Sequence, residues 1–148
     1  MKKTILWMMA LTIGAMMNMG CAKKEGCMNP LATNYNDDAK KDCNCCTYSG
    51  ELVFWVNQSS ASYISTIGMA STLKYYVDGQ FVGSNAASQY WTSGPTCGQN
   101  GSITVTKDLG TNKTKGFTFS VVDEDGYTWW EGTVNIDGEK CMQYELSL

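Results

Sequence analysis

Residues 116–138 read GFTFSVVDEDGYTWWEGTVNIDG, two alternating stretches on either side of an acidic turn that ends in Gly126. Successive residues of a strand point to opposite faces, so this alternation predicts a β-hairpin with one buried face. Asp, Glu and Gly at the centre are typical of a turn. The side chains expected on the buried face are Phe117, Phe119 and Val121 before the turn and Trp130, Val134 and Ile136 after it.

The same period of two recurs through the rest of the chain from Glu51 onward. In TLKYYVDGQFVG (72–83), Asp78-Gly79 predicts a two-residue hairpin turn, with Phe81 expected on the buried face after it. Residues 59–72 are either a loop or a short strand, and residues 84–101 are a long loop. The other predicted strands lie in ELVFWVN (51–57), SITVT (102–106) and CMQYELSL (141–148).

These six or seven short strands predict an all-β protein. Their number and spacing favour an antiparallel β-sandwich of the Ig or transthyretin type over residues 50–148. Charged residues are 17% of the 148, the net charge is −3, and there is no histidine. The chain therefore has no basic footprint for nucleic acid, and histidine-based catalysis and histidine-ligated metals are excluded.

The first residues predict export. MKKTILWMMALTIGAMMNMGC has two lysines followed by an apolar stretch that is too short to span a membrane, as in a signal peptide. Gly20-Cys21 resembles the lipobox of bacterial lipoproteins, although Asn18 stands where that family prefers Leu or Val. The resemblance implies a signal peptide over 1–20, a lipid on Cys21, a tether over 21–25 and an anchor, most simply in the outer membrane. Cleavage after Ala22 without lipidation is the alternative.

Six cysteines remain after Cys21, and an even number in an exported chain predicts a disulfide framework. Four lie in GCMNPLATNYNDDAKKDCNCCTY (26–48). This stretch resembles a Cys-rich module of exported Bacteroidota proteins, of the form GCxDPxAxNYNxxAxxDDGSCxY, which is similar to the calcium repeats of thrombospondin type 3. The resemblance implies a Cys27–Cys46 disulfide. The bridge would close a loop of about 20 residues and stabilise it by roughly 3 kcal/mol.

Calcium binding by this module is open. Its amide and carboxylate oxygens are of the kind that calcium takes, but Asn29, Cys43 and Asn44 depart from the family pattern. The alternative is that these side chains cap turns and bond to nearby backbone. The candidate ligands are Asn34, Asn36, Asp38 and Asp42.

The remaining cysteines allow several arrangements. Either Cys43 and Cys45 form a disulfide in a tight C-x-C ring, or one of them competes with Cys46 for the disulfide to Cys27. A third arrangement is that the cluster holds a soft metal. Cys97 and Cys141 each precede a predicted strand, and such positions can lie side by side at one end of a sandwich, so a bridge is expected. This region resembles small β domains of exported Bacteroidota proteins, which share motifs found here at 77–83, 95–98 and 130–134 and a cysteine at Cys141.

The sequence predicts a binding or structural module of the cell envelope that is not an enzyme. Adjacent aromatic pairs in three strands place one ring of each pair outward, and two more rings lie in the long loop. Such rings suit a glycan or a protein partner if they converge, and they are ordinary surface residues if they are scattered. A hydrolase using Asp123 and Glu124 is a weaker alternative, because these carboxylates sit in a turn. The candidate ligand-binding residues are Trp55, Tyr76, Tyr90, Trp91 and Trp129.

Overall fold

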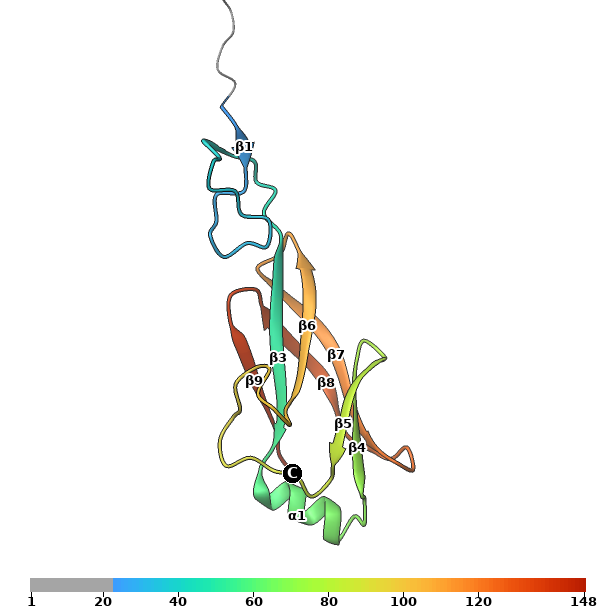
Figure 1. The fold of residues 1–148 in the computed structure, drawn as a ribbon. Helices are drawn as coiled ribbons and strands as arrows, with labels where there is room; N and C mark the ends of the chain where they lie inside the picture. Colours follow the sequence, from blue (N-terminus) through green and yellow to red (C-terminus); the bar gives the residue numbers. More distant parts are fainter. Residues whose placement is uncertain (1–22) are drawn as a thin grey trace, which may run out of the picture.

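The computed structural model describes residues 23–148, so the predicted signal peptide and Cys21 lie outside the described part of the chain. The fold is mostly strands with one short helix (Figure 1). No helix within 23–148 is long and apolar enough to cross a membrane. In chain order the elements are β1 (Glu25–Gly26), β2 (Lys41–Asp42), β3 (Tyr48–Val56), α1 (Gln58–Thr66), β4 (Thr72–Val77), β5 (Gln80–Ala86), β6 (Ile103–Gly110), β7 (Thr114–Asp123), β8 (Thr128–Asp137) and β9 (Cys141–Leu146).

Two sheets pack face to face as a sandwich. The three-stranded sheet has the order β6-β3-β9, in which β3 is antiparallel to β6 and parallel to β9. The four-stranded sheet has the order β5-β4-β7-β8 and is antiparallel throughout. The predicted all-β fold is confirmed, but the expectation of a wholly antiparallel sandwich is wrong, because β9 runs parallel to β3. Both predicted hairpins form, as β4–β5 and as β7–β8.

The core lies between the two sheets, where the alternating residues predict it. Phe54 of β3 is 2% exposed and its ring lies 5.9 Å from that of Tyr75 on β4 and 5.4 Å from that of Phe119 on β7. Aromatic pairs at such distances add to the stability that burial alone supplies. Tyr75 itself is so buried that its pKa rises to about 12. The hydrophobic packing of β3 against β4 and β7 therefore holds the sheets together.

Phe81 is not on the buried face, contrary to expectation. Asp78 and Gly79 both have positive φ and close the turn, with Val77 paired to Gln80 and Tyr76 paired to Phe81. This pairing puts Phe81 on the outer face beside Tyr76, with the ring centroids 5.7 Å apart, and leaves Phe81 58% exposed. The turn was predicted correctly, but the face of the sheet on which Phe81 lies was predicted wrongly. Residues that pair across the turn share a face, so Phe81 lies on the outer face with Tyr76.

Residues 58–66 form the helix α1 and are neither the loop nor the strand expected there. Asn57 caps the helix, since its side-chain oxygen accepts a hydrogen bond from the backbone N–H of Ser60 at 2.9 Å. Ala61 and Ile64, which lie three positions apart, are buried against the open end of the sandwich. The serines and the threonine of this segment have only weak helix propensity. The Asn57 cap and the burial of the apolar stripe therefore stabilise the helix.

The Cys-rich module of residues 26–48 lies at the other end of the molecule from α1, and β3 leads directly from it into the sandwich (Figure 1). Two disulfides, Cys27–Cys46 and Cys43–Cys45, staple the module. Tyr48, the first residue of β3, is buried between module and sandwich, and its hydroxyl accepts a hydrogen bond from Asn29 at 3.0 Å. The module is thereby packed onto the sandwich at Tyr48.

The third disulfide joins Cys97 in the long loop to Cys141 at the start of β9. The side chain of Gln143 donates hydrogen bonds to the carbonyls of Gly94 and Pro95, both at 3.1 Å. The backbone N–H of Trp91 donates to the carbonyl of Val56 at 3.0 Å. The loop is therefore fixed along the outer side of the three-stranded sheet. Cys27–Cys46 is the bridge that the resemblance implies, Cys97–Cys141 is the expected bridge, and Cys43–Cys45 is one of the arrangements left open by the sequence.

Candidate functional site

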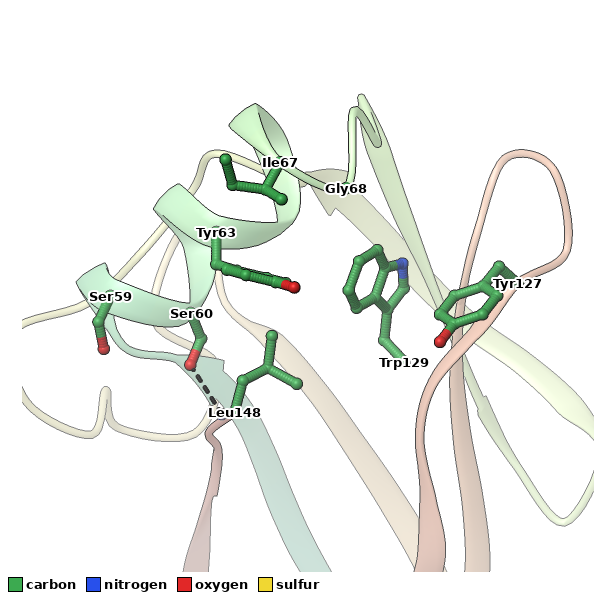
Figure 2. A pocket seen from close by; sticks show the side chains of 8 residues that line it. All are labelled: Ser59, Ser60, Tyr63, Ile67, Gly68, Tyr127, Trp129 and Leu148. Carbon is green, nitrogen blue, oxygen red and sulfur yellow. Dashed lines mark hydrogen bonds between the residues drawn. The ribbon is translucent and has the colours of Figure 1, made fainter.

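A cleft of about 610 Å³ opens at the end of the sandwich, between α1 and the strand β8 (Figure 2). It combines aromatic and aliphatic side chains with hydroxyl groups, and none of its lining side chains is charged. We call it the helix cleft. Its lining residues are Ser59, Ser60, Tyr63, Ile67, Gly68, Tyr127, Trp129 and Leu148.

Trp129 forms one wall of the helix cleft. The pairing of β7 with β8 shifts register between Val121 and Val122, so Trp129 is the extra residue of a bulge. Its indole N–H donates to a carboxylate oxygen of Asp123 at 3.1 Å. The ring lies directly over Gly68, where a Cβ would come within 2.4 Å of it. The tryptophan is therefore fixed in the cleft by the bulge, by Asp123 and by the absence of a side chain at Gly68.

Asp123 organises the turn that carries this wall. Its carboxylate also accepts hydrogen bonds from the backbone N–H groups of Asp125 at 3.1 Å and Tyr127 at 2.8 Å, and the residue is buried. Tyr127 packs edge-on against Trp129, with the ring centroids 5.1 Å apart. The buried carboxylate is thus fully used in shaping the turn and positioning the two rings.

Glu124 ties the same turn to the segment that enters β4. Its carboxylate accepts hydrogen bonds from the hydroxyl of Ser71 at 2.7 Å and from the backbone N–H groups of Ser71 at 2.8 Å and Thr72 at 3.0 Å. These bonds, led by the one from the Ser71 hydroxyl, lower the pKa of Glu124 to about 2. Such a carboxylate stays ionised and engaged, which suits a structural role.

The opposite wall of the helix cleft comes from α1. Tyr63 and Ile67, one helical turn apart, are 52% and 67% exposed. Figure 2 shows the Tyr63 ring extending toward Trp129 across the opening. Below it, the hydroxyl of Ser60 accepts a hydrogen bond from the backbone N–H of Leu148 at 3.0 Å. The helix thus contributes both an exposed ring and a fixed floor.

A second, more open cleft of about 770 Å³ lies on the other side of the start of α1, and we call it the loop cleft. Trp55 on β3 pairs with Glu145 on β9, and the loop fixed by Cys97–Cys141 adds Trp91. The amide of Asn57 donates to the Glu145 carboxylate at 2.8 Å. Its lining residues are Trp55, Asn57, Gln58, Ser59, Ser62, Trp91, Thr92 and Glu145.

The five aromatic residues proposed from the sequence do not form one patch. Trp55 and Trp91 meet in the loop cleft, and Trp129 lines the helix cleft. Tyr76 packs against Phe81 on the outer face of the four-stranded sheet. Tyr90 is 44% exposed and is not among the residues lining either cleft.

Sequence reasoning missed Tyr63, Ile67 and Tyr127, which complete the helix cleft. The first two escaped because residues 59–72 were not recognised as a helix. Two signals were present in the sequence. Asn57 is a strong capping residue just before the segment, and Tyr63 and Ile67 stand four positions apart.

The four candidate calcium ligands are engaged in hydrogen bonds or an ion pair with other residues of the chain. The Asn34 side chain accepts from the N–H of Thr47 and donates to the carbonyl of Cys45, both at 2.8 Å. Asp38 forms a 2.7 Å ion pair with Lys24, whose hydrogen bond and charge lower the pKa of Asp38. Asn36 and Asp42 each accept a hydrogen bond from a backbone N–H two residues later.

Each of the four candidate ligands has a protein partner in the structure. Calcium takes six to eight oxygen ligands around one point, whereas each of the four side chains here is engaged with its own neighbours. Within residues 23–148, no three His, Cys, Asp or Glu side chains are grouped so as to hold a metal ion. Asn36 and Asp42 form the bonds of the turn-forming alternative, and calcium binding by the module stays a prediction.

Comparisons with known protein families, with curated proteins and with solved structures give no match to this chain. What the protein binds therefore has to be inferred from the chemistry of its two clefts.

Proposed function

We propose that this chain is an exported lipoprotein of the bacterial cell envelope that binds a ligand and does not catalyse a reaction. The observation that carries the proposal is the placement of the clefts. The N-terminal module lies at one end of the sandwich, and α1, beside which both clefts open, lies at the other (Figure 1). A lipid on Cys21 would therefore leave both clefts facing away from the membrane.

The family relationships remain part of this proposal. We propose that the module is of the thrombospondin type 3-like kind found in exported Bacteroidota proteins and that the sandwich is of the Ig or transthyretin type. In support, the module has the Cys27–Cys46 bridge that the resemblance implies. The sandwich has seven strands divided three and four, within the range typical of such domains.

The anchor is tested by growing bacteria that express the full chain with a labelled fatty acid. We expect the label to enter the wild-type chain and to be absent from the Cys21→Ser variant. Label in that variant, or none in the wild type, would remove the lipoprotein assignment and leave cleavage after Ala22.

Neutral glycans are the ligand class that the loop cleft favours. Two tryptophans, Trp55 and Trp91, stand beside the amide of Asn57 and the carboxylate of Glu145. Flat aromatic faces suit the C–H faces of sugar rings, and amide and carboxylate groups suit their hydroxyls. The alternative is a hydrolase using Asp123 and Glu124. It is disfavoured because both carboxylates are already hydrogen-bonded, that of Asp123 to the backbone of the turn and that of Glu124 to Ser71.

The glycan proposal is tested by titrating the purified chain with neutral gluco-, manno- and xylo-oligosaccharides and following tryptophan fluorescence. We expect a saturable change with at least one series and its loss in the Trp91→Ala variant. Phe81→Ala removes an exposed ring that lines neither cleft and serves as the control. No change with any series would refute glycan binding.

A further inference from the structure

We propose that the helix cleft and the loop cleft are two parts of one binding site, which takes an extended neutral oligosaccharide lying across the start of α1. The inference deepens the proposed glycan binding and rests on it. It adds the length of the ligand and a direct role for Tyr63 and Trp129, and it extends the argument for a neutral ligand to both clefts.

The two clefts meet at the first turns of α1. Ser59 lines both of them, Ser60 lines only the helix cleft, and Ser62 lines only the loop cleft. Ser59 and Ser62 are exposed. The clefts therefore border each other at the small, exposed side chain of Ser59, where the hydroxyls of a sugar chain can bond to serine hydroxyls.

Each cleft supplies aromatic surface of its own. The helix cleft presents the rings of Tyr63, Tyr127 and Trp129, and the loop cleft presents those of Trp55 and Trp91. The Trp129 ring is held before a ligand arrives by Asp123 and Gly68, and the backbone that carries Trp91 is held by its hydrogen bond to the carbonyl of Val56. A preorganised ring such as that of Trp129 binds with less loss of side-chain entropy.

Charge selects a neutral ligand. No lysine or arginine lines either cleft, and the single charged side chain among the lining residues is the carboxylate of Glu145. The chain as a whole carries a net charge of −3. A glycan bearing uronate, sulfate or phosphate groups would find no cation to pair with and would be repelled.

The experiment measures affinity against ligand length by calorimetry, using the full-length chain in a detergent without a sugar headgroup. The probes are gluco-, manno- and xylo-oligosaccharides of two to six residues, with oligogalacturonates as the anionic series. We expect the hexasaccharide of the preferred series to bind at least tenfold more tightly than its disaccharide, and oligogalacturonates not to bind.

Two variants separate the clefts. Tyr63→Ala and Trp55→Ala each remove one exposed or half-buried ring, and loss of a stacking contact is expected to weaken hexasaccharide binding about tenfold. Disaccharide binding should fall in only one of the two variants. Phe81→Ala should change neither affinity, and circular dichroism of each variant verifies that it is folded.

The outcomes distinguish the inference from the proposed function. Equal affinity for the disaccharide and the hexasaccharide, or a hexasaccharide affinity unaffected by Tyr63→Ala, would overturn the single extended site and leave glycan binding in one cleft. Tight binding of oligogalacturonates would overturn the neutral specificity. No binding of any sugar would overturn the proposed glycan function together with the inference.

Discussion

The Cys-rich module and the sandwich reach a fixed structure by different means. The module spans 23 residues, buries only Cys27, Ala32, Ala39 and, against the sandwich, Tyr48, and holds two disulfides. The sandwich buries aromatic and aliphatic side chains from both sheets and uses its one disulfide to fix a loop. A short segment cannot bury enough apolar surface to offset its chain entropy, whereas about 100 residues can. Covalent staples and a packed core are therefore alternative solutions within one chain.

Removing a core ring is the largest perturbation and should act on the sandwich. Phe54→Ala leaves a cavity among Tyr75, Phe119 and Tyr144 and is expected to lower the free energy of unfolding by about 3–5 kcal/mol. Urea unfolding followed by tryptophan fluorescence measures it. The exposed Phe81→Ala should stay within about 0.5 kcal/mol of the wild type. A small effect of Phe54→Ala would mean that the disulfides, and not the core, hold the sandwich.

Removing the Cys27–Cys46 disulfide should destabilise the module and leave the sandwich unaffected. The Cys27→Ser and Cys46→Ser double variant opens a loop of about 20 residues, at a cost of about 3 kcal/mol in the chain-entropy model. Hydrogen exchange should show the amides of 26–48 losing protection while those of β4 and β7 keep theirs. If the sheets also lose protection, the packing at Tyr48 makes module and sandwich one cooperative unit.

The short staple should matter less. Cys43–Cys45 closes a three-residue loop, for which the same model gives about 1.6 kcal/mol. Replacing both cysteines by serine should raise exchange only near residues 42–46. Protection lost over the whole module would show that this ring, and not Cys27–Cys46, organises it.

The smallest effect is the acid response of Glu124. Its pKa is about 2 in the folded protein and near 4.5 without its partners, so it stabilises the sandwich above about pH 4.5. That contribution is lost as the pH falls from about 4.5 to about 2. Stability measured across this range should fall less steeply in Glu124→Gln. An unchanged slope in Glu124→Gln would refute the role assigned to the Ser71 bonds.

The sequence predicted the strands and the two hairpins because each depends on local pattern, and the even number of cysteines predicted disulfides without fixing all of their pairings. Alternating residues such as Leu73, Tyr75 and Val77 reveal a strand with one buried face, and Asp78-Gly79 reveals its turn. The helix α1 was not predicted, since residues 58–66 are rich in serine and become helical through the Asn57 cap and the burial of Ile64.

The candidate site was predicted only in part for the same reason. Trp55 and Trp91 were chosen as outward aromatics, but nothing local indicates that a loop residue and a strand residue share a cleft. The bulge at Trp129 also escaped, because one extra residue changes which way the following side chains point. Both clefts are formed by contacts between segments that are distant in the sequence. The alternation of residues within one segment carries no information about such contacts.

The continuity of β3 has a mechanical consequence. This strand begins at the module and ends beside α1, and it is the central strand of its sheet, with β6 on one side and β9 on the other. A pull between a tethered N-terminus and a load held at the α1 end would run along β3. Its hydrogen bonds to both neighbours would then be sheared together instead of being peeled apart one after another. The strand that connects the two regions is thus placed to bear tension between them.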